Sequence, residues 1–169
     1  MPSPLMPDYM FRAFDEISPD FLQGLGIRAI LSDIDNTLAP YEQAEPDARL
    51  QNWISALSDA GISIALVSNN GRERVELFNR SLGVPVYWKC GKPFTKNMVI
   101  AMNNLGGTPE TTVMIGDQLL TDALAAHNMG IRCLIVPPIR DKRNLFIRFK
   151  RWVERPTVRR FKKRNGIDW

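Results

Sequence analysis

Two aspartates, Asp33 and Asp35, follow directly on a short apolar run, residues 27–32. A carboxylate such as Asp33 can attack phosphorus and form an acyl phosphate, which divides a difficult hydrolysis into two easier steps. Asp35 can protonate the leaving oxygen and later deprotonate the attacking water. Two like charges that face a dianionic ester require a cation, and Mg²⁺ is expected because it binds few protein oxygens together with water and substrate phosphate. The pair is therefore compatible with magnesium-dependent hydrolysis of a phosphate ester, although two such carboxylates taken alone are more typical of a loop in which they cap backbone amides.

Apolar runs of strand length alternate with segments of helical periodicity over most of the chain. The predicted strands are 27–32, 62–67, 84–88, 112–115 and 131–136, and the predicted helices between them are 46–60, 72–82, 94–105 and 117–129. This order predicts an α/β fold, a Rossmann-like three-layer sandwich with a central parallel five-stranded sheet covered on both faces. The first 26 residues predict only short helical pieces, one of them begun by Ser18 and Pro19.

Polar residues gather where the predicted strands end. They occupy positions 33–37, 68–70, 91–93 and 116–117. Ligands of open parallel sheets bind beyond the carboxyl ends of the strands, so we expect these groups to meet in one site. Arg72 and Arg74 flank a predicted helix start, and we expect both to face solvent.

The segment from Asp33 to Leu38 reads Asp-Ile-Asp-Asn-Thr-Leu and resembles the D-x-D-x-T signature of the haloacid dehalogenase (HAD) superfamily. Ser68, Lys92 and residues 116–122 resemble the second, third and fourth motifs of that superfamily, in the same order. The resemblance covers roughly residues 27–136. Within the superfamily the chain is similar to small bacterial phosphatases of subclass IIIA, and these resemble phosphatases that act on phosphatidylglycerophosphate.

The resemblance implies a role for each matching residue. The magnesium ligands would be Asp33, the backbone carbonyl of Asp35, and Asp117. The catalytic set would be Asp33, Asp35, Thr37, Ser68 and Lys92, with Ser68, Asn69 and Lys92 binding the substrate phosphate and Asp122 supporting Lys92 or a metal-bound water. Thr37 would steady the turn between the two aspartates. Simpler structural roles remain open for several of these residues: Asp117 as a helix N-cap, Asp122 as a helix-surface acid, Ser68 and Asn69 as turn residues, and Lys92 as a surface charge.

Two further observations bear on the substrate. An acid at position 35 favours phosphate chemistry, because a dehalogenase needs no proton donor there. The gaps from Leu38 to Ser68 and from Ser68 to Lys92 are filled by the predicted elements, so no cap domain is expected. A site without a cap is open to large substrates, such as lipid head groups, polynucleotide ends or protein phosphates.

The charge of the chain is distributed unevenly. The net charge is +4, but residues 139–165 hold twelve basic and two acidic residues, against ten basic and sixteen acidic elsewhere. We expect a phosphatase domain at 1–138, with its core at 27–136, and a basic amphipathic tail at 139–169. No apolar run reaches the roughly 20 residues that span a bilayer. Cys90, Cys133 and His127 form no zinc pattern, and buried free thiols in a cytoplasmic protein are expected.

The tail predicts a helix over residues 144–154. Its apolar residues share one face, and its basic residues lie mostly on the other; the apolar set is Leu145, Phe146, Phe149, Trp152 and Val153, and the basic set is Arg148, Lys150, Arg151 and Arg155. Such a helix is typical of contact with an anionic membrane interface. Packing of the apolar face on the domain is the alternative, and nucleic-acid binding is a weaker one. After Pro156, the composition of residues 159–164 predicts disorder unless this segment is bound to something.

The leading hypothesis is a phosphomonoesterase that acts on phosphatidylglycerophosphate, in the cytoplasm or peripherally on the inner membrane surface. The first alternative is a soluble phosphatase for a sugar phosphate, a nucleotide or a polynucleotide end. The second is an RNA-binding protein with a vestigial site, which the intact set of Asp33, Asp35, Ser68, Lys92 and Asp117 argues against.

Overall fold

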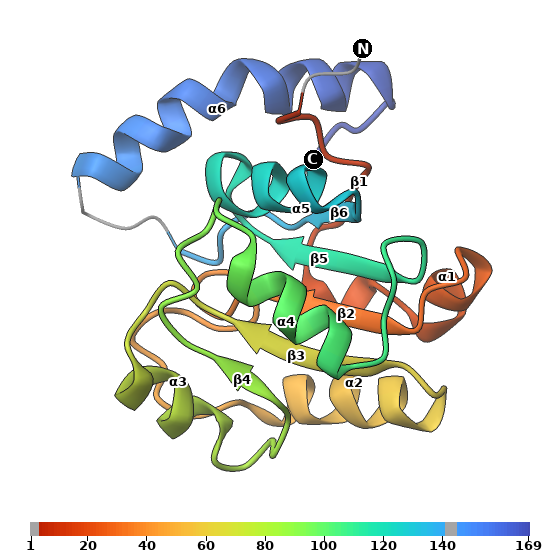
Figure 1. The fold of residues 1–169 in the computed structure, drawn as a ribbon. Coiled ribbons are helices and arrows are strands. Elements are labelled where there is room, and N and C mark those ends of the chain that lie inside the picture. Colours follow the sequence, from red (N-terminus) through yellow and green to blue (C-terminus); the bar gives the residue numbers. More distant parts are fainter. Residues whose placement is uncertain (1–3, 141–144) are drawn as a thin grey trace.

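The computed structural model describes residues 4–140 and 145–169. At its centre lies a parallel sheet of six strands in the order β1-β6-β5-β2-β3-β4 (Figure 1). The strands are β1 (Tyr9–Met10), β2 (Ala29–Ser32), β3 (Ser63–Val67), β4 (Val86–Tyr87), β5 (Thr112–Gly116) and β6 (Arg132–Ile135). The predicted α/β class is confirmed, and the described residues contain no cap domain, but the sheet has six strands rather than five.

The extra strand, β1, lies in a segment for which the sequence predicted only helical pieces. Tyr9 pairs with Leu134 and Met10 with Ile135, in parallel register. The side chain of Asp8 accepts a hydrogen bond from the backbone nitrogen of Cys133 at 2.8 Å, which holds the segment against the sheet. A two-residue strand is too short to show a periodic pattern, so the open edge of β6 rather than local sequence decides this pairing.

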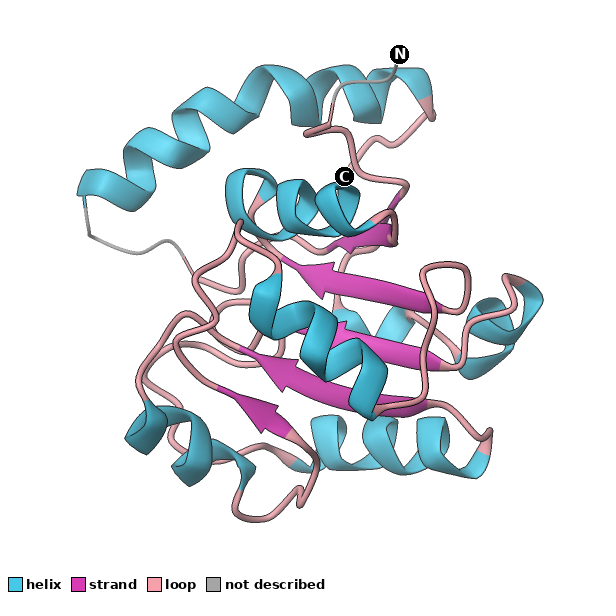
Figure 2. Cartoon of the chain, viewed as in Figure 1, coloured by secondary structure: helices cyan, strands magenta, loops and turns pink. Residues whose placement is uncertain are grey.

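Helices fill the connections between strands, as predicted (Figure 2). The helical elements are η1 (Phe14–Glu16), α1 (Pro19–Gly24), α2 (Ala48–Asp59), α3 (Arg72–Asn79), α4 (Lys96–Asn104), the π-helical segment η2 (Leu119–Ala123), α5 (Leu124–Met129) and α6 (Leu145–Arg164). The predicted start of α1 is confirmed, because the Ser18 hydroxyl accepts a hydrogen bond from the Phe21 backbone nitrogen at 3.1 Å. The predicted helix 117–129 is divided into η2 and α5.

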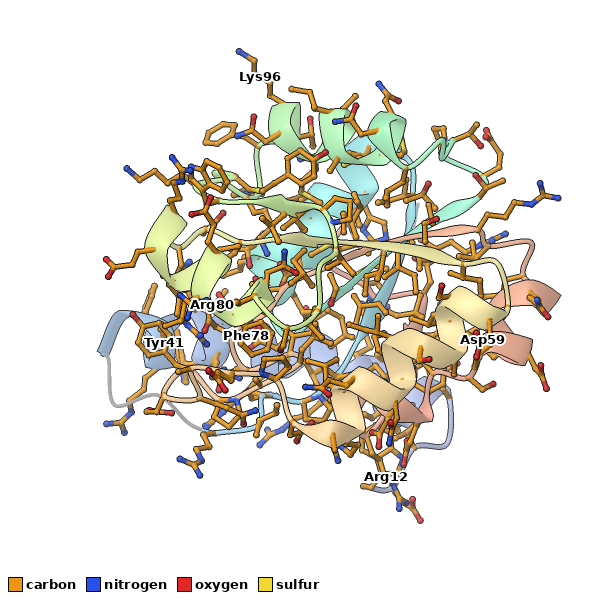
Figure 3. All side chains as sticks on the ribbon, turned by 90° about the horizontal axis from the view of Figure 1, so that it is seen from below. Arg12, Tyr41, Asp59, Phe78, Arg80 and Lys96 are labelled. Carbon is orange, nitrogen blue, oxygen red and sulfur yellow. The ribbon has the colours of Figure 1, made fainter. Side chains whose placement is uncertain are left out.

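The two faces of the sheet carry separate apolar clusters because successive strand residues point to opposite sides. Ile30 of β2 belongs to the cluster that packs against α1, α2 and α3. Leu31, its neighbour, belongs to the cluster under α4 and α5, where the free thiols of Cys90 and Cys133 are buried as expected. Figure 3 shows α2, which ends at Asp59, and α4, which begins at Lys96, on opposite sides of the strands.

Helix α6 runs along one side of the molecule, beyond α5 (Figure 1). The prediction of disorder at 159–164 is wrong, because α6 continues through Pro156 to Arg164 and buries Phe161. Proline removes one helical hydrogen bond, the one to the Trp152 carbonyl, and both Pro156 and Trp152 are exposed to water. Burial of Phe161 stabilises the helix beyond the proline. Among the described residues, no helix has the length and apolar character to cross a bilayer.

The expected apolar face of this helix is not its packed face. Phe149 and Trp152 are 59% and 64% exposed, and their rings stack on each other with centroids 6.1 Å apart. Val158 and Phe161 pack inward instead. The alternative in which the apolar face of this helix packs on the domain is therefore wrong for Phe149 and Trp152. Asn144 and the side chains of Leu145 and Phe146 lie outside the described part of the chain.

Candidate active site

The predicted site residues meet at the carboxyl ends of β2, β3 and β5, around a cavity of about 240 Å³. Its lining includes Asp33, Asp35, Ser68, Asn69, Lys92 and Asp122. The loops after β2, β3, β4 and β5 supply these side chains because all four strands run in the same direction. Helix α6 also lines this cavity, through Ile147 and Lys150.

The amine of Lys92 joins two carboxylates. Its Nζ atom lies 2.7 Å from Asp33 Oδ1 and 2.7 Å from Asp122 Oδ1, and the Lys92 side chain is only 2% exposed. Burial lowers the pKa of this amine, but the two carboxylates outweigh burial and raise the pKa above that of an ordinary lysine. Lys92 is therefore a fixed positive charge beside Asp33 and not a surface lysine.

Asp122 is buried under the loop that follows β5. Its Oδ2 atom accepts hydrogen bonds from the backbone nitrogens of Asp117 at 3.2 Å and Gln118 at 3.1 Å. Gly116 allows this close approach, because a Cβ atom at that position would lie 2.3 Å from the Asp122 carboxyl. The carboxyl thus connects the Asp117 loop to Lys92.

The carboxyl of Asp35 is held by two side chains at the start of α3. Its Oδ1 atom lies 3.0 Å from the guanidinium of Arg74, and its Oδ2 atom accepts a hydrogen bond from the Asn70 amide. Arg74 is therefore not solvent-facing as predicted, because the buried carboxylate recruits its guanidinium. Burial and the nearby Asp33 charge raise the pKa of Asp35 above the ordinary value of an aspartate, against the opposing effects of Arg74 and Asn70.

Thr37 and Asp117 complete the carboxylate group. The Thr37 hydroxyl lies 3.3 Å from Asp33 Oδ2 and 3.5 Å from Asp117 Oδ1, so it contacts both carboxylates. Burial, Asp122 and Asp33 raise the pKa of Asp117 well above its usual range. A nearby cation would stabilise the ionised form of Asp117, because this carboxylate is buried among other negative charges.

Ser68 and Asn69 occupy the turn after β3. The Asn69 side chain donates to the Lys92 carbonyl at 3.1 Å and accepts from the Lys92 backbone nitrogen at 2.8 Å, which fixes the loop that carries Lys92. The Ser68 hydroxyl oxygen accepts from the backbone nitrogen of Asn70 at 3.1 Å. Both residues line the cavity, and the contacts of Asn69 indicate that it also positions Lys92.

Helix α6 contributes residues to the site that sequence reasoning missed. The guanidinium of Arg151 lies 3.0 Å from Asp117 Oδ2, so this residue is not on the outer basic face where the sequence placed it. One turn further on, Glu154 Oε1 accepts a hydrogen bond from the Leu120 backbone nitrogen at 2.9 Å. Ile147, Arg151, Glu154, Val158 and Phe161 follow one another at spacings of four and three, a stripe that was available in the sequence as a signal.

The carboxylates offer a fitting site for a divalent metal. One carboxylate oxygen from each of Asp33, Asp117 and Asp122 lies within 4.8 Å of the others. Hard cations such as Mg²⁺ prefer such oxygen ligands. Both oxygens of Asp122 are engaged, Oδ1 by Lys92 and Oδ2 by two backbone nitrogens. Asp33 Oδ2 and Asp117 Oδ1 make only long contacts with the Thr37 hydroxyl, at 3.3 Å and 3.5 Å, so these two oxygens are better placed to bind a metal.

Comparisons with known proteins identify the family. Residues 89–138 match a family model described as HAD-hydrolase-like. Over 164 residues the chain is 34% identical to the probable phosphatase YqeG of Bacillus subtilis. The matched region covers 97% of this chain and 95% of that protein. The chain belongs to the HAD superfamily. It is an enzyme of the HAD phosphatase type.

Solved structures support the HAD fold. A putative HAD superfamily (subfamily III A) hydrolase from Legionella pneumophila matches with a TM-score of 0.51 at 19% identity, over 69% of this chain and 70% of that chain. A putative 3-deoxy-D-manno-octulosonate 8-phosphate phosphatase from Vibrio cholerae matches with a TM-score of 0.50 at 19% identity, over 68% and 78%. This HAD enzyme thus shares its overall fold with those proteins.

Proposed function

We propose that the chain hydrolyses phosphate monoesters through a covalent phosphate on Asp33. The observation that carries this proposal is the pairing of Asp33 with Lys92 at 2.7 Å, in a cavity that Asp35 also lines. A carboxylate can attack phosphorus, and the amine beside it offsets negative charge as the phosphoryl group is transferred. The nucleophile, a proton donor and a fixed positive charge therefore share one cavity.

The reaction proceeds in two displacements. An oxygen of Asp33 bonds to phosphorus while the bond from phosphorus to the leaving oxygen breaks, and that oxygen takes a proton from Asp35. A water molecule then gives a proton to Asp35 and bonds to phosphorus, while the bond from phosphorus to Asp33 breaks. Inorganic phosphate leaves, and both aspartates return to their starting forms. The raised pKa of Asp35 suits this role, because its carboxyl must hold a proton in the first displacement.

Lys92 and Ser68 bind the phosphoryl oxygens in this proposal. The charge of Lys92 is held in place by Asp122, and its backbone is held by Asn69, so little reorganisation is needed when negative charge develops. Thr37 contacts both Asp33 and Asp117 and orients the nucleophile. Each residue thus binds or positions a group that the two displacements require.

Magnesium is the proposed cofactor. Its ligands would be the carboxylates of Asp33 and Asp117 and the backbone carbonyl of Asp35, and it would supply positive charge to the phosphoryl group. Asp122 stays with Lys92. The raised pKa of Asp117 supports a metal at this position, because the carboxylate is buried beside Asp122 and Asp33.

The favoured substrate is phosphatidylglycerophosphate at an anionic membrane surface. Phe149, Trp152 and Val153 form an exposed apolar patch on α6, and the exposed Arg148 and Arg155 lie beside it in sequence. Exposed aromatic residues next to basic ones are typical of helices that bind an anionic bilayer interface. The same helix lines the cavity, so membrane contact and substrate entry involve one element.

A phosphatase assay with a substrate panel tests the proposal. The panel contains phosphatidylglycerophosphate in anionic vesicles, a sugar phosphate, a nucleotide and p-nitrophenyl phosphate, each with Mg²⁺ and with a chelator. We expect magnesium-dependent phosphate release, with the lipid as the best substrate. Faster phosphate release from the sugar phosphate or the nucleotide than from the lipid would show that the enzyme prefers soluble substrates. The absence of phosphate release from every substrate would refute the proposed activity.

A further inference from the structure

Arg151 of α6 makes a short contact with the Asp117 side chain. One terminal nitrogen of its guanidinium donates to Asp117 Oδ2 at 3.0 Å, and the Asp117 side chain is 0% exposed, so bulk water does not compete for that oxygen. The other carboxylate oxygen, Oδ1, makes a longer contact with the Thr37 hydroxyl at 3.5 Å. A hydrogen bond between two ionised groups is about twice as strong as one between neutral groups. Arg151 therefore determines the orientation of this carboxylate more than Thr37 does.

The contact with Arg151 engages one oxygen of Asp117 and leaves the other for a metal. Asp117 Oδ1 and Asp33 Oδ2 both lie beside the Thr37 hydroxyl, at 3.5 Å and 3.3 Å. Mg²⁺ demands a near-ideal octahedral arrangement of its oxygen ligands, so a ligand oxygen has to be held in place before the metal binds. A partner on Oδ2 holds the carboxylate in this way without occupying Oδ1.

The helix that carries Arg151 is itself fixed to the domain. Glu154 Oε1 accepts a hydrogen bond from the Leu120 backbone nitrogen at 2.9 Å, and the Phe161 side chain is buried. Leu120 lies in η2, three residues after Asp117. A supporting residue can position a ligand only if its own location is fixed, and these two contacts meet that requirement.

The segment that precedes α6 contacts the other loop of the site. The backbone nitrogen of Ile139 donates to the Asn36 carbonyl at 3.1 Å, and that of Arg140 donates to the Asn36 side-chain oxygen at 3.3 Å. Asn36 lies between Asp35 and Thr37, with φ of 66°, a left-handed conformation that asparagine adopts more readily than most residues. The chain after β6 therefore contacts both loops that supply the proposed metal ligands.

We infer that Arg151 is a positioning residue of the metal site, which orients Asp117 through Oδ2 so that Oδ1 binds Mg²⁺. The inference rests on the proposed magnesium cofactor and adds α6, which lies outside residues 27–136, to the elements that build its site. Arg151 acts through Asp117 and contacts neither the substrate nor the metal. Loss of such an outer partner of a metal ligand typically weakens metal binding about 10–100-fold.

Calorimetric titration of the full-length protein with Mg²⁺, without substrate, tests the inference. For Arg151→Met we expect the Kd for Mg²⁺ to rise about tenfold or more. The positive charge of Arg151 repels a second cation, so loss of that charge alone would lower the Kd. The sign of the change thus separates orientation from repulsion, and an unchanged or lower Kd overturns the inference.

Arg151→Lys tests orientation at constant charge. Lysine keeps the positive charge on a shorter side chain without the planar guanidinium, so the Kd should rise, but less than for Arg151→Met. This variant leaves no uncompensated charge at Asp117, and it decides the question if circular dichroism shows that Arg151→Met does not fold. A Kd for Arg151→Lys that is equal to or below that of wild type then overturns the inference.

Two control variants separate positioning from other effects of the helix. Arg159→Met removes one positive charge at an exposed position of α6 and should leave the Kd unchanged, whereas a rise equal to that of Arg151→Met would make net charge the cause and overturn the inference. Glu154→Ala removes the contact with Leu120 and keeps Arg151. If Glu154→Ala raises the Kd as much as Arg151→Met does, Arg151 serves only to attach the helix, and the inference is overturned.

The titration needs no turnover, so its outcome is independent of the proposed reaction. A weaker affinity for Mg²⁺ in the Arg151 variants supports the inference even if no substrate releases phosphate. A wild-type protein that binds no Mg²⁺ overturns the inference, and phosphate release in the presence of a chelator then shows whether the phosphatase function stands without the metal.

Discussion

Replacement of Lys92 by methionine removes the amine that Asp33 and Asp122 share and leaves an apolar side chain of similar length. The Lys92, Asp122 and Asp33 side chains are 2%, 1% and 12% exposed, so water cannot replace the lost charge. Removing one partner of a buried ion pair costs about 3–5 kcal/mol. A chain of this size loses roughly 2–4 °C in Tm per kcal/mol, so Lys92→Met should lower Tm by about 6–20 °C at neutral pH.

Thermal unfolding followed by circular dichroism at pH 7.5 and pH 5, without added metal, measures this effect. Burial raises the pKa of Asp122, and Lys92 opposes that rise, so the variant has a still higher folded-state pKa at this residue. A carboxyl whose pKa is higher in the folded than in the unfolded state destabilises the fold above the unfolded pKa. The penalty diminishes as pH falls through the folded pKa, because the group takes up a proton. The difference in Tm from wild type should therefore be smaller at pH 5.

A second substitution tests whether unpaired charge causes the loss. Asp122→Asn keeps an oxygen to accept from the Asp117 and Gln118 backbone but removes one negative charge. In the Lys92→Met background it should recover about half of the lost stability, since one of two unpaired carboxylates is gone. A fall in Tm of less than about 2 °C for Lys92→Met, against the expected fall of about 6–20 °C, would refute the reasoning. So would a further loss of stability on adding Asp122→Asn.

Four more outcomes are expected. Asp33→Asn should reduce phosphate release at least about 1,000-fold, or roughly 4 kcal/mol, without changing Tm by more than a few degrees, because the amide fills the same space but cannot attack phosphorus; turnover within tenfold of wild type would contradict the mechanism. Asp117→Ala should weaken Mg²⁺ binding measured by calorimetry and shift the activity midpoint to higher Mg²⁺, whereas an unchanged midpoint would limit Asp117 to a structural role. Phe149→Ser with Trp152→Ser should reduce binding to anionic vesicles in sedimentation assays, most clearly at high salt where the contribution of about 1 kcal/mol per basic residue is screened; equal binding by both proteins would reject the aromatic contact. His127→Gln should remove the stabilisation that the partly exposed pair of His127 with Asp8 provides, an effect below about 1 kcal/mol. This stabilisation is complete below about pH 6.5 and disappears as pH rises through the raised pKa of His127. If Tm changes with pH in the same way for both proteins from pH 6 to pH 8, the pair contributes nothing to stability.

Deletion of residues 139–169 is a poorer test of membrane contact than these point substitutions. It would remove Arg151, which pairs with Asp117, and Phe161, which is buried. A loss of activity after truncation would then report damage to the site wall as well as loss of binding. Substitution of the two aromatic residues reduces this difficulty because their side chains are largely exposed and Arg151 and Phe161 stay in place.

The strand-end residues were predictable because two independent patterns agreed on them. The apolar runs fixed where β2, β3 and β5 end, and the polar residues Asp33, Ser68 and Asp117 follow those ends directly. Parallel strands bring such positions together whatever the details of packing. Strand β1 was not predictable in the same way, since its two residues are ordered by pairing with β6 rather than by their own pattern.

Two of the errors concern charged side chains that were assigned to solvent by type. Arg74 and Arg151 were expected outside, yet each pairs with a buried aspartate at 3.0 Å. Burying a carboxylate without a partner is costly, so the fold recruits a cation from whichever element lies near. That pairing depends on tertiary structure, and only the spacing of Ile147, Arg151 and Glu154 along α6 gave a local sign of it.

Helix α6 has different neighbours on its two sides, with Arg151 against the carboxylates and Phe149 in solvent. An α-helix with its side chains is about 10–12 Å across. On a bilayer bound through the aromatic side, the catalytic carboxylates would stand about one helix diameter above the plane of the lipid head groups. A phosphorylated head group would need to extend by only that distance, with its acyl chains left in the bilayer. The thickness of a single helix would thus set the length of head group that the enzyme can reach.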